Sequence, residues 1–174
     1  MKIILRNWEM KDAQNLAQII NNKKIQDYLR DGLAYPYTVH DAENYIEQIR
    51  GDDPQKAVAL AICVEDRVVG NISVTRGENI HARTAELGYY LAEPDWGKGI
   101  ATNAVKQLCS YIFKHTDILR IFAQPFSENI ASCRVLEKAG FCLEGTLRKN
   151  AFKNGKVWDM KLYALVKDEP EIPN

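Results

Sequence analysis

The sequence predicts a mixed α/β (α+β) single domain whose elements follow one another in the order β-αα-βββ-α-β-α-ββ. The chain has 174 residues, a length that suits one domain, and 46% of them are hydrophobic, enough for a sizeable core. Apolar residues recur with helical spacing in some segments and alternate with polar ones in others. No repeat, linker or low-complexity run divides the chain, so residues 1–168 are expected to form the domain and the polar residues 169–174 a frayed tail.

The first half of the chain predicts one strand, two helices and three strands. Ala13, Leu16 and Ile20 share one face of the first helix, and the aromatic loop "DYLRDGLAYPYT" separates it from the second. A tight acidic turn at Glu65-Asp66 joins two of the strands. The expected elements are a strand over 2–7, helices over 11–20 and 41–50, and strands over 57–64, 67–75 and 84–92.

The second half predicts a long helix, a strand, a short helix and a hairpin. An apolar stripe through Ile100, Leu108 and Ile112 indicates the long helix. Gly140 is a natural stop for the short helix, and Asn154-Gly155 is the strongest short-range signal for a hairpin turn. The expected elements are helices over 100–114 and 129–138, a strand over 119–124, and hairpin strands over 141–152 and 157–166.

Composition excludes several classes of partner. Lys plus Arg and Asp plus Glu both number 23, so the net charge is zero, which argues against general affinity for nucleic acid. No apolar run suits a signal peptide or a membrane span, so a cytoplasmic protein without a membrane partner is expected. Four cysteines, at 63, 109, 133 and 142, lack C-x-x-C spacing, and no histidine stands at a zinc-finger offset. Free, mostly buried thiols and no metal are therefore expected.

The stretch "DWGKGIATNAV", residues 95–105, combines a strand end, a glycine turn and the start of a helix. The first amides of a helix have no partner within it, and the helix dipole adds partial positive charge there. Glycine lets the backbone approach a phosphate closely, and Lys98 adds a full charge. The pattern matches neither a P-loop nor the dinucleotide-binding G-x-G-x-x-G. It predicts a phosphate or pyrophosphate site, with a tight structural turn as the alternative.

Four blocks of the chain carry a resemblance to a known family. Taken together, and spread over residues 2–167, they resemble the GNAT superfamily of acyl-CoA-dependent N-acetyltransferases, and more narrowly its RimJ/RimL-type branch, which acetylates protein N-termini. The blocks are "YPYTVHDAENYI", "ELGYYLAEPDWGKGIATNAV", "ENIASCRVLEKAGF" and "EGTLRKNAFKNGKVWDMKLYAL".

The resemblance implies a GNAT-like fold, with a central, mostly antiparallel, twisted sheet of about seven strands and flanking helices. It also implies transfer of an acetyl group from acetyl-CoA, as co-substrate and without a metal, to a primary amine by direct attack in a ternary complex. The acceptor it implies is a protein or peptide N-terminal α-amine. A monomer or a homodimer is expected.

Coenzyme A would be held mainly by backbone. The superfamily's pyrophosphate loop usually begins with Gln or Arg, where this chain has Trp96, as its branch commonly does. Lys98 is expected near the phosphates. By resemblance, the backbone of Tyr89, Tyr90 and Leu91 pairs with the pantetheine arm, and an amide near Leu91 serves the oxyanion, while the side chains of Tyr89 and Leu91 are expected in the core. The expected pyrophosphate contacts are Trp96, Gly97, Lys98, Gly99, Ile100, Ala101 and Thr102.

Asn129 and Ser132 stand one turn apart at the start of the short helix. Asn129 suits an N-cap, and the resemblance adds a contact to the pantetheine arm. Many superfamily members place a tyrosine in this helix as general acid, but that position here is Leu136, which cannot donate a proton. Ser132 is the best-placed hydroxyl to serve the leaving thiolate, with an ordinary helix-face serine as the alternative. Cys133 falls on a different face, which argues against a covalent role.

Glu86 is the candidate general base. It shares one face of the strand over 84–92 with Gly88 and Tyr90, whereas the apolar residues of the strand lie on the other face. A carboxylate there must be solvated or paired. The alternative is a structural ion pair, for example with Arg83 or Arg120. An α-amine titrates near 7.7–8.0, against about 10.4 for lysine, so a weak base or a water relayed by Glu86 would suffice for the α-amine.

Candidate acceptor contacts are aromatic residues near the expected groove, and hairpin or core packing is the alternative for each. They are Tyr35, Tyr37, Tyr90, Trp158 and, beside them, Asp159.

Two other functions stay open at this stage. One is acetylation of a small amine such as a polyamine, an amino acid or an antibiotic, and the other is a non-catalytic acyl-CoA-binding sensor.

Overall fold

The computed structural model describes residues 1–168, and the expected frayed tail lies outside the described residues. Seven strands form one sheet in the order β1-β2-β3-β4-β5-β7-β6. All neighbours are antiparallel except β4 and β5, which are parallel. The strands are β1 (Ile3–Asn7), β2 (Ala57–Val64), β3 (Arg67–Arg76), β4 (Thr84–Leu91), β5 (Arg120–Ala123), β6 (Cys142–Lys153) and β7 (Lys156–Val166). The predicted fold class and element order are confirmed.

The helices also lie where the apolar periodicity predicted them, with bounds that agree to within two residues. The α-helices are α1 (Ala13–Ile20), α2 (Lys23–Gln26), α3 (Val39–Gly51), α4 (Ile100–His115) and α5 (Ile130–Lys138), and the 3-10 turns are η1 (Met10–Asp12), η2 (Asn79–His81) and η3 (Glu93–Asp95). The sequence did not predict α2, because four residues are too few to show a helical period. Asn22 caps this helix by accepting a hydrogen bond from the Lys24 amide at 2.9 Å.

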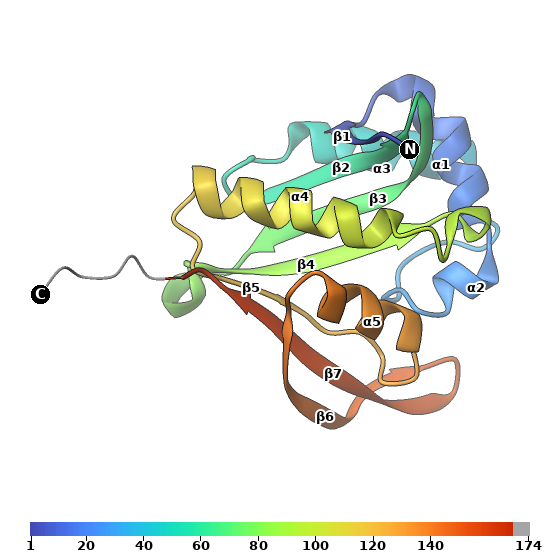
Figure 1. Cartoon of the computed structure of the whole chain (residues 1–174). Coiled ribbons are helices and arrows are strands. Elements are labelled where there is room, and N and C mark those ends of the chain that lie inside the picture. The colour runs from blue at the N-terminus through green and yellow to red at the C-terminus, as the bar shows by residue number, and fades with distance from the viewer. Residues whose placement is uncertain (169–174) are drawn as a thin grey trace, which may run out of the picture.

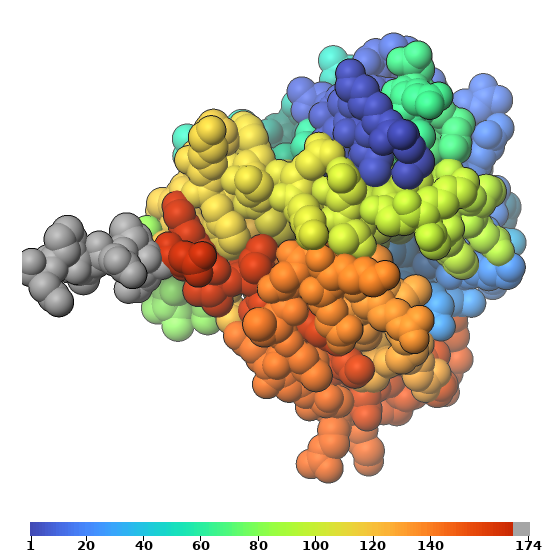
Figure 2. All heavy atoms as spheres, in the orientation of Figure 1, coloured from blue at the N-terminus to red at the C-terminus, as the bar shows by residue number. Residues whose placement is uncertain are grey.

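The sheet separates two apolar cores. Helices α4 and α5 cover one face, and α1 and α3 cover the other (Figure 1). Residues of β2 alternate between them: Ile62 packs into the α4 side, while Ala61 and Cys63 pack into the α1 and α3 side. Figure 2 shows α4, in yellow, meeting α5, in orange, across the first face. The four cysteines are free thiols, and only that of Cys142 is exposed.

The functionally important feature of the sheet is a split between β4 and β5. These strands pair only through Thr84–Glu86 and Arg120–Phe122. Beyond Glu86, β4 continues along β3, whereas β5 continues along β7, so the two strands diverge (Figure 1). Residues 87–91 of β4 therefore have a strand partner on one side alone. None of the helices formed by residues 1–168 has the length and apolar run that crossing a membrane requires.

Candidate active site

A cleft of about 890 Å³ opens where β4 and β5 diverge. It connects the glycine turn at the start of α4 with Glu86 at the other end of the split. Six segments contribute to its lining: Lys24–Arg30, the polar face of β3, strand β4 with the turn up to Thr102, the end of β5 and the residues after it from Ala123 to Phe126, Glu128 with one face of α5 as far as Lys138, and Met160 of β7. The structure thus brings the two main candidate regions of the sequence into one cavity.

The glycine turn has the backbone of an anion site. Gly97 and Gly99 adopt φ values of +74° and +76°, which residues with a Cβ rarely adopt. A Cβ added at either position would meet no protein atom within 4 Å, so the space beside the turn is open. Gly99 is the N-cap of α4, and the first bond within the helix runs from the Asn103 amide to Gly99 O at 3.1 Å. The amides of residues 100–102 consequently have no partner within the helix and face the cleft end.

Trp96 has a role that its motif position did not reveal. Its indole Nε1 donates a hydrogen bond to Leu91 O at 2.9 Å. This bond ties the segment that leads into the glycine turn back to the end of β4. The indole therefore holds the turn against the strand that borders the cleft, although nearly half of the Trp96 surface remains exposed.

Lys98 is held by a buried carboxylate. Its Nζ lies 3.1 Å from Asp95 Oδ1, and the guanidinium of Arg67 donates to both Asp95 oxygens at 2.8 and 2.9 Å. Asp95 is only 1% exposed, and the hydrogen bonds from Arg67 hold the pKa of its carboxyl below the usual value. A buried charge needs such partners. Sequence reasoning missed Asp95, although its spacing of three residues from Lys98 was a usable signal.

The candidate backbone contacts on β4 are placed at the split. Leu91 pairs with Gly70 of β3 and has no β5 residue on its other side. The Leu91 side chain is buried, as expected, and Tyr90 packs toward the core between the sheet and helices α1 and α3. Tyr89 packs against the core between the sheet and helices α4 and α5. Its hydroxyl also makes a polar contact, because its Oη lies 2.8 Å from Ser132 Oγ.

The start of α5 supplies the candidate thiolate partner. Asn129 is an N-cap, because its Oδ1 accepts a hydrogen bond from the Ser132 amide at 3.1 Å. Both residues line the cleft. Cys133 is buried in the core and lies outside the lining of the cleft, in agreement with its expected helix face. Leu136, which stands where many superfamily members have a tyrosine, is also buried outside the lining.

Glu86 lies in the cleft and forms an ion pair with Arg30. The partners named from the sequence, Arg83 and Arg120, were wrong. Arg83 donates to the Asp117 backbone oxygen at 2.9 Å, and Arg120 forms a bond to Glu144 at 2.7 Å. Arg30 could not be chosen from the sequence, since it comes from an irregular loop 56 positions away.

Beside Glu86, the adjoining face of β3 is polar. Across the β3–β4 register, Thr75 pairs with Glu86 and Ser73 with Gly88. Further along, Asn71 pairs with Tyr90 and accepts hydrogen bonds from Trp8 Nε1 at 3.0 Å and from the Tyr45 hydroxyl at 3.4 Å. All three β3 residues line the cleft, so the region around Glu86 offers hydroxyl and amide groups to a bound polar molecule.

The opposite wall is aromatic. Tyr28 and Phe126 line the cleft with ring centroids 6.3 Å apart, and Trp158 packs behind Phe126 at 5.3 Å. The loop that carries Tyr28 and Arg30 is tied to the β6–β7 hairpin: Lys153 Nζ donates to Gln26 O at 2.7 Å and to Leu29 O, and Asn154 Nδ2 donates to Asp27 at 3.0 Å. Sequence reasoning named neither Tyr28 nor Phe126.

Four candidate acceptor residues lie outside the lining of the cleft. Tyr37 is buried and donates to Asp41 O at 3.3 Å, and Tyr35 is exposed beneath the Lys23 ammonium. Trp158 reaches the cleft only through Phe126, and Asp159 accepts a hydrogen bond from the Lys149 amide at 2.7 Å. Of the five residues proposed for the acceptor, Tyr90 alone is part of the lining.

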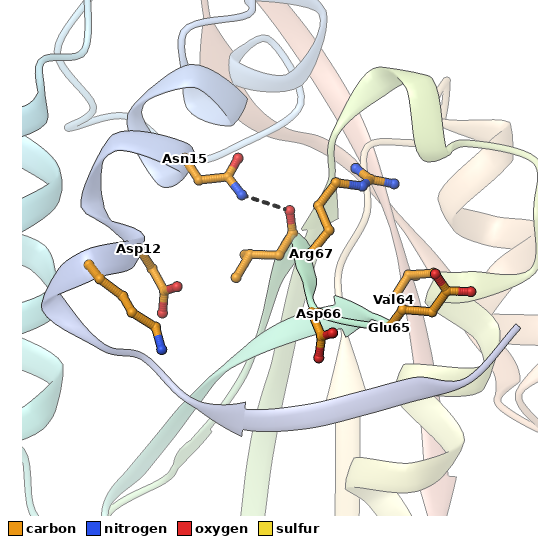
Figure 3. Close-up of a pocket in the computed structure, with 8 residues that line it drawn as sticks. Asp12, Asn15, Val64, Glu65, Asp66 and Arg67 are labelled. Atoms are coloured by element: carbon orange, nitrogen blue, oxygen red, sulfur yellow. Dashed lines mark hydrogen bonds between the residues drawn. The ribbon is translucent and has the colours of Figure 1, made fainter.

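A second hollow lies between η1, the start of α1 and the β2–β3 turn (Figure 3). Asn15 spans it by donating to Val68 O at 3.1 Å. Two of its charged groups are already paired, Asp12 with Arg6 and Arg67 with Asp95. It contains none of the candidate residues. Within residues 1–168, no three His, Cys, Asp or Glu side chains gather as a metal site.

A split parallel pair, a glycine turn at a helix start and a hydroxyl-bearing helix opposite define the donor site of an acyl-CoA-dependent acetyltransferase. Residues 2–142 match the acetyltransferase (GNAT) domain, and the chain belongs to that family. It is an N-acetyltransferase that uses acetyl-CoA.

Relatives extend over nearly the whole chain. The uncharacterized N-acetyltransferase YnaD of Bacillus subtilis is 29% identical over 168 residues, covering 97% of this chain and 95% of YnaD. The ribosomal-protein-serine acetyltransferase of Escherichia coli is 31% identical over 157 residues, covering 88% and 86%. The crystal structure of the microcin C7 self-immunity acetyltransferase MccE in complex with acetyl-CoA and AMP superposes with a TM-score of 0.83 at 30% identity, covering 95% and 93%. The predicted resemblance to the RimJ/RimL-type branch is confirmed.

Proposed function

We propose that the chain acetylates the α-amine of a protein or peptide N-terminus. One observation carries the proposal: a single cleft joins the glycine turn to a partly buried carboxylate, Glu86, across the split in the sheet. The similarity to a ribosomal-protein-serine acetyltransferase supports a protein acceptor. An α-amine also suits the chemistry, because its ordinary pKa is near 8 and a lysine amine titrates about two units higher. A larger fraction of the α-amine is therefore neutral, and able to attack, near neutral pH.

On the donor side, the backbone of residues 96–102 would hold the pyrophosphate. The two left-handed glycines and the free amides of α4 fit an anion there, and Lys98 adds positive charge from its place beside Asp95. The pantetheine arm would lie along Tyr89, Tyr90 and Leu91, whose outer edge has no strand partner, and reach Asn129 and Ser132. Acetyl-CoA supplies the activated acetyl group, and the chain positions its carbonyl beside the amine.

On the acceptor side, Glu86 would take the proton of the ammonium, directly or through one water, so that the neutral amine can attack. Its carboxylate is paired with Arg30, so the acceptor ammonium must replace Arg30 beside it. The Leu91 amide would donate a hydrogen bond to the developing oxyanion. Ser132 would donate a hydrogen bond from its hydroxyl to the sulfur as the C–S bond breaks.

The aromatic wall of Tyr28 and Phe126 and the polar face of β3 would bind the first residues of the acceptor. This assignment replaces Tyr35 and Tyr37, which lie outside the lining, whereas Tyr90 keeps its proposed place. Trp158 and Asp159 would act from behind, through the packing of Phe126 and the fixed Lys149 amide. A cytoplasmic location and a monomeric or homodimeric state stay predictions.

A small-molecule amine is the second candidate acceptor. The structure of MccE in complex with acetyl-CoA and AMP favours it, because that protein matches this chain over nearly its full length. The ion pair of Arg30 and Glu86 also offers both charges that a small zwitterion would need. The third possibility, a non-catalytic sensor, is set aside because the chain is an acetyltransferase.

A thiol-release assay with acetyl-CoA tests the proposal. The panel contains peptides that begin with small residues, the same peptides blocked at the α-amine, polyamines and aminoglycosides. We expect turnover of the free peptides and none of the blocked peptides, even where these contain lysine. Turnover of polyamines or aminoglycosides without turnover of any free peptide would replace the proposal by the small-molecule alternative.

A further inference from the structure

Two hydroxyl groups meet at the middle of the cleft. Tyr89 projects from β4 toward α5, and its Oη lies 2.8 Å from Ser132 Oγ and 3.2 Å from the Ser132 backbone oxygen. Both residues line the cleft. The contact joins the two walls of the split, since one hydroxyl comes from the strand and the other from the helix.

Each hydroxyl has one hydrogen, which limits the possible arrangements. If Ser132 donates to Tyr89, the tyrosine hydrogen goes to the Ser132 carbonyl and Ser132 has no hydrogen left for a ligand. If Tyr89 donates to Ser132 Oγ, the serine hydrogen is free to point into the cleft. A negatively charged acceptor in the cleft favours the second arrangement, because hydrogen bonds to charged groups are the stronger ones.

The tyrosine is suited to remain the donor. Burial raises the pKa of Tyr89 well above its ordinary value, so the phenol keeps its proton while a thiolate forms beside it. A hydroxyl that accepts one hydrogen bond also becomes a better donor of its own hydrogen. Other groups near the pair are Cys133, buried behind it, and Arg134 and Lys138, which line the cleft on α5.

We propose that Tyr89 is a positioning residue for the acetyl transfer: it donates its hydroxyl hydrogen to Ser132 Oγ and thereby directs the Ser132 hydroxyl to the sulfur of coenzyme A. This inference rests on the proposed donor site but not on the identity of the acceptor. As the amine nitrogen bonds to the acetyl carbon, the C–S bond breaks and its electron pair goes to sulfur. Tyr89 and Ser132 stabilise that charge by hydrogen bonds and lose no proton, while the proton of the amine leaves on the acceptor side.

The test reads the thiol of bound coenzyme A and needs no acceptor. The thiolate is followed by its ultraviolet absorbance during a pH titration of the coenzyme A complex. A free thiol titrates near 8.5. We expect the wild type to lower the pKa of the bound thiol, and Tyr89→Phe to weaken thiolate formation about threefold to tenfold, the scale of one hydrogen bond. Tyr89→Phe in the Ser132→Ala background should have no further effect, because the tyrosine acts through the serine.

Tyr163→Phe is the matched control. Tyr163 is another buried tyrosine, and its hydroxyl donates to Glu137 Oε1 at 2.8 Å, outside the lining of the cleft. Its loss should lower thermal stability without changing the thiol titration. A wild-type titration in Tyr89→Phe, or equal effects of Tyr89→Phe with and without Ser132, would overturn the inference. Absence of coenzyme A binding to the wild type would overturn the donor site and this inference together. If coenzyme A binds but no amine is acetylated in the thiol-release assay, only the proposed acceptor is contradicted.

Discussion

Arg30 forms an ion pair with Glu86 inside the cleft, so the candidate base and a cation from a neighbouring loop occupy the same place. Arg30 is mostly exposed, and ion pairs at exposed positions contribute little stability. The pair therefore opens at small cost. Lys153 and Asn154 hold the loop from β6 and its turn, so Arg30 can move without the loop losing its place.

Opening the pair gives the first prediction. Arg30→Gln removes the competitor of a cationic acceptor for Glu86. We expect kcat/KM for amine acceptors to rise about threefold to fivefold, the scale of one exposed ion pair, and the rise to shrink with added salt. Lys24→Gln is the control, because it removes a cation of α2 that also lines the cleft but pairs with Glu93 instead. A fall in kcat/KM would mean that Arg30 itself binds the acceptor.

Coenzyme A binding should depend on the glycine turn. Gly99→Val places a branched side chain on a left-handed backbone and beside the open space where the phosphates would lie. We expect at least tenfold weaker binding in calorimetry, about 1.4 kcal/mol, with the fold kept.

The strain of the substitution must be separated from the loss of the site. Gly140→Val is the control, since Gly140 has φ +98° at the end of α5 and lies outside the lining of the cleft. It should lower stability by a similar amount and leave coenzyme A binding unchanged. Equal affinity of folded Gly99→Val and wild type would remove the anion-site interpretation.

The sequence predicted what depends on local pattern. The alternation along β4 placed Glu86 on one face and Leu87 on the other, and Asn129 was recognisable as a cap from its position before an apolar helix. The glycine turn was recognisable because Gly97 and Gly99 stand between a strand and a helix. The split of the sheet was not predicted, since it arises from the register of β4 and β5.

Contacts between distant segments were not predictable. The Glu86 partner comes from a loop without periodicity, and the Tyr89 hydroxyl meets Ser132 across 43 positions. Lys153 was one of many surface lysines in the sequence, but in the structure its side chain is nearly buried against the Gln26 and Leu29 carbonyls. In each case the decisive signal is a tertiary distance, which neither spacing nor composition contains.

Asp95 should support stability in a pH-dependent way. Arg67, and then Lys98, lower the pKa of its carboxyl in the folded state. A group with a lowered folded pKa stabilises the protein above its unfolded pKa, near 3.9, and loses that effect as pH falls through the folded value. Asp95→Asn should therefore unfold more easily than wild type at pH 7, by about 1.5 to 3 kcal/mol, the scale of hydrogen bonds to a charged group.

The difference between wild type and Asp95→Asn should shrink below pH 4, as measured by urea unfolding at several pH values. Asp117→Asn is the control, because Asp117 is paired with Arg76 at 2.6 Å but is mostly exposed. Its effect should be much smaller than that of Asp95→Asn at every pH, because exposed ion pairs contribute little stability. A pH-independent deficit in Asp95→Asn would assign the loss to packing rather than to the charge.

Glu86 can be tested as a base by comparing two variants that break the same ion pair. Arg30→Gln and Glu86→Gln both remove the pair, but only Glu86→Gln removes the carboxylate. A general base contributes roughly 10²-fold or more, so we expect Glu86→Gln to lower kcat/KM about a hundredfold near neutral pH, while Arg30→Gln does not. The deficit should shrink at high pH, where the acceptor amine is already neutral and needs no base. The measurement is the pH profile of kcat/KM for wild type and both variants with one peptide acceptor. Parallel profiles for wild type and Glu86→Gln, or equal losses in the two variants, would reduce Glu86 to a structural partner of Arg30 and move the search for the base to a water on the polar face of β3.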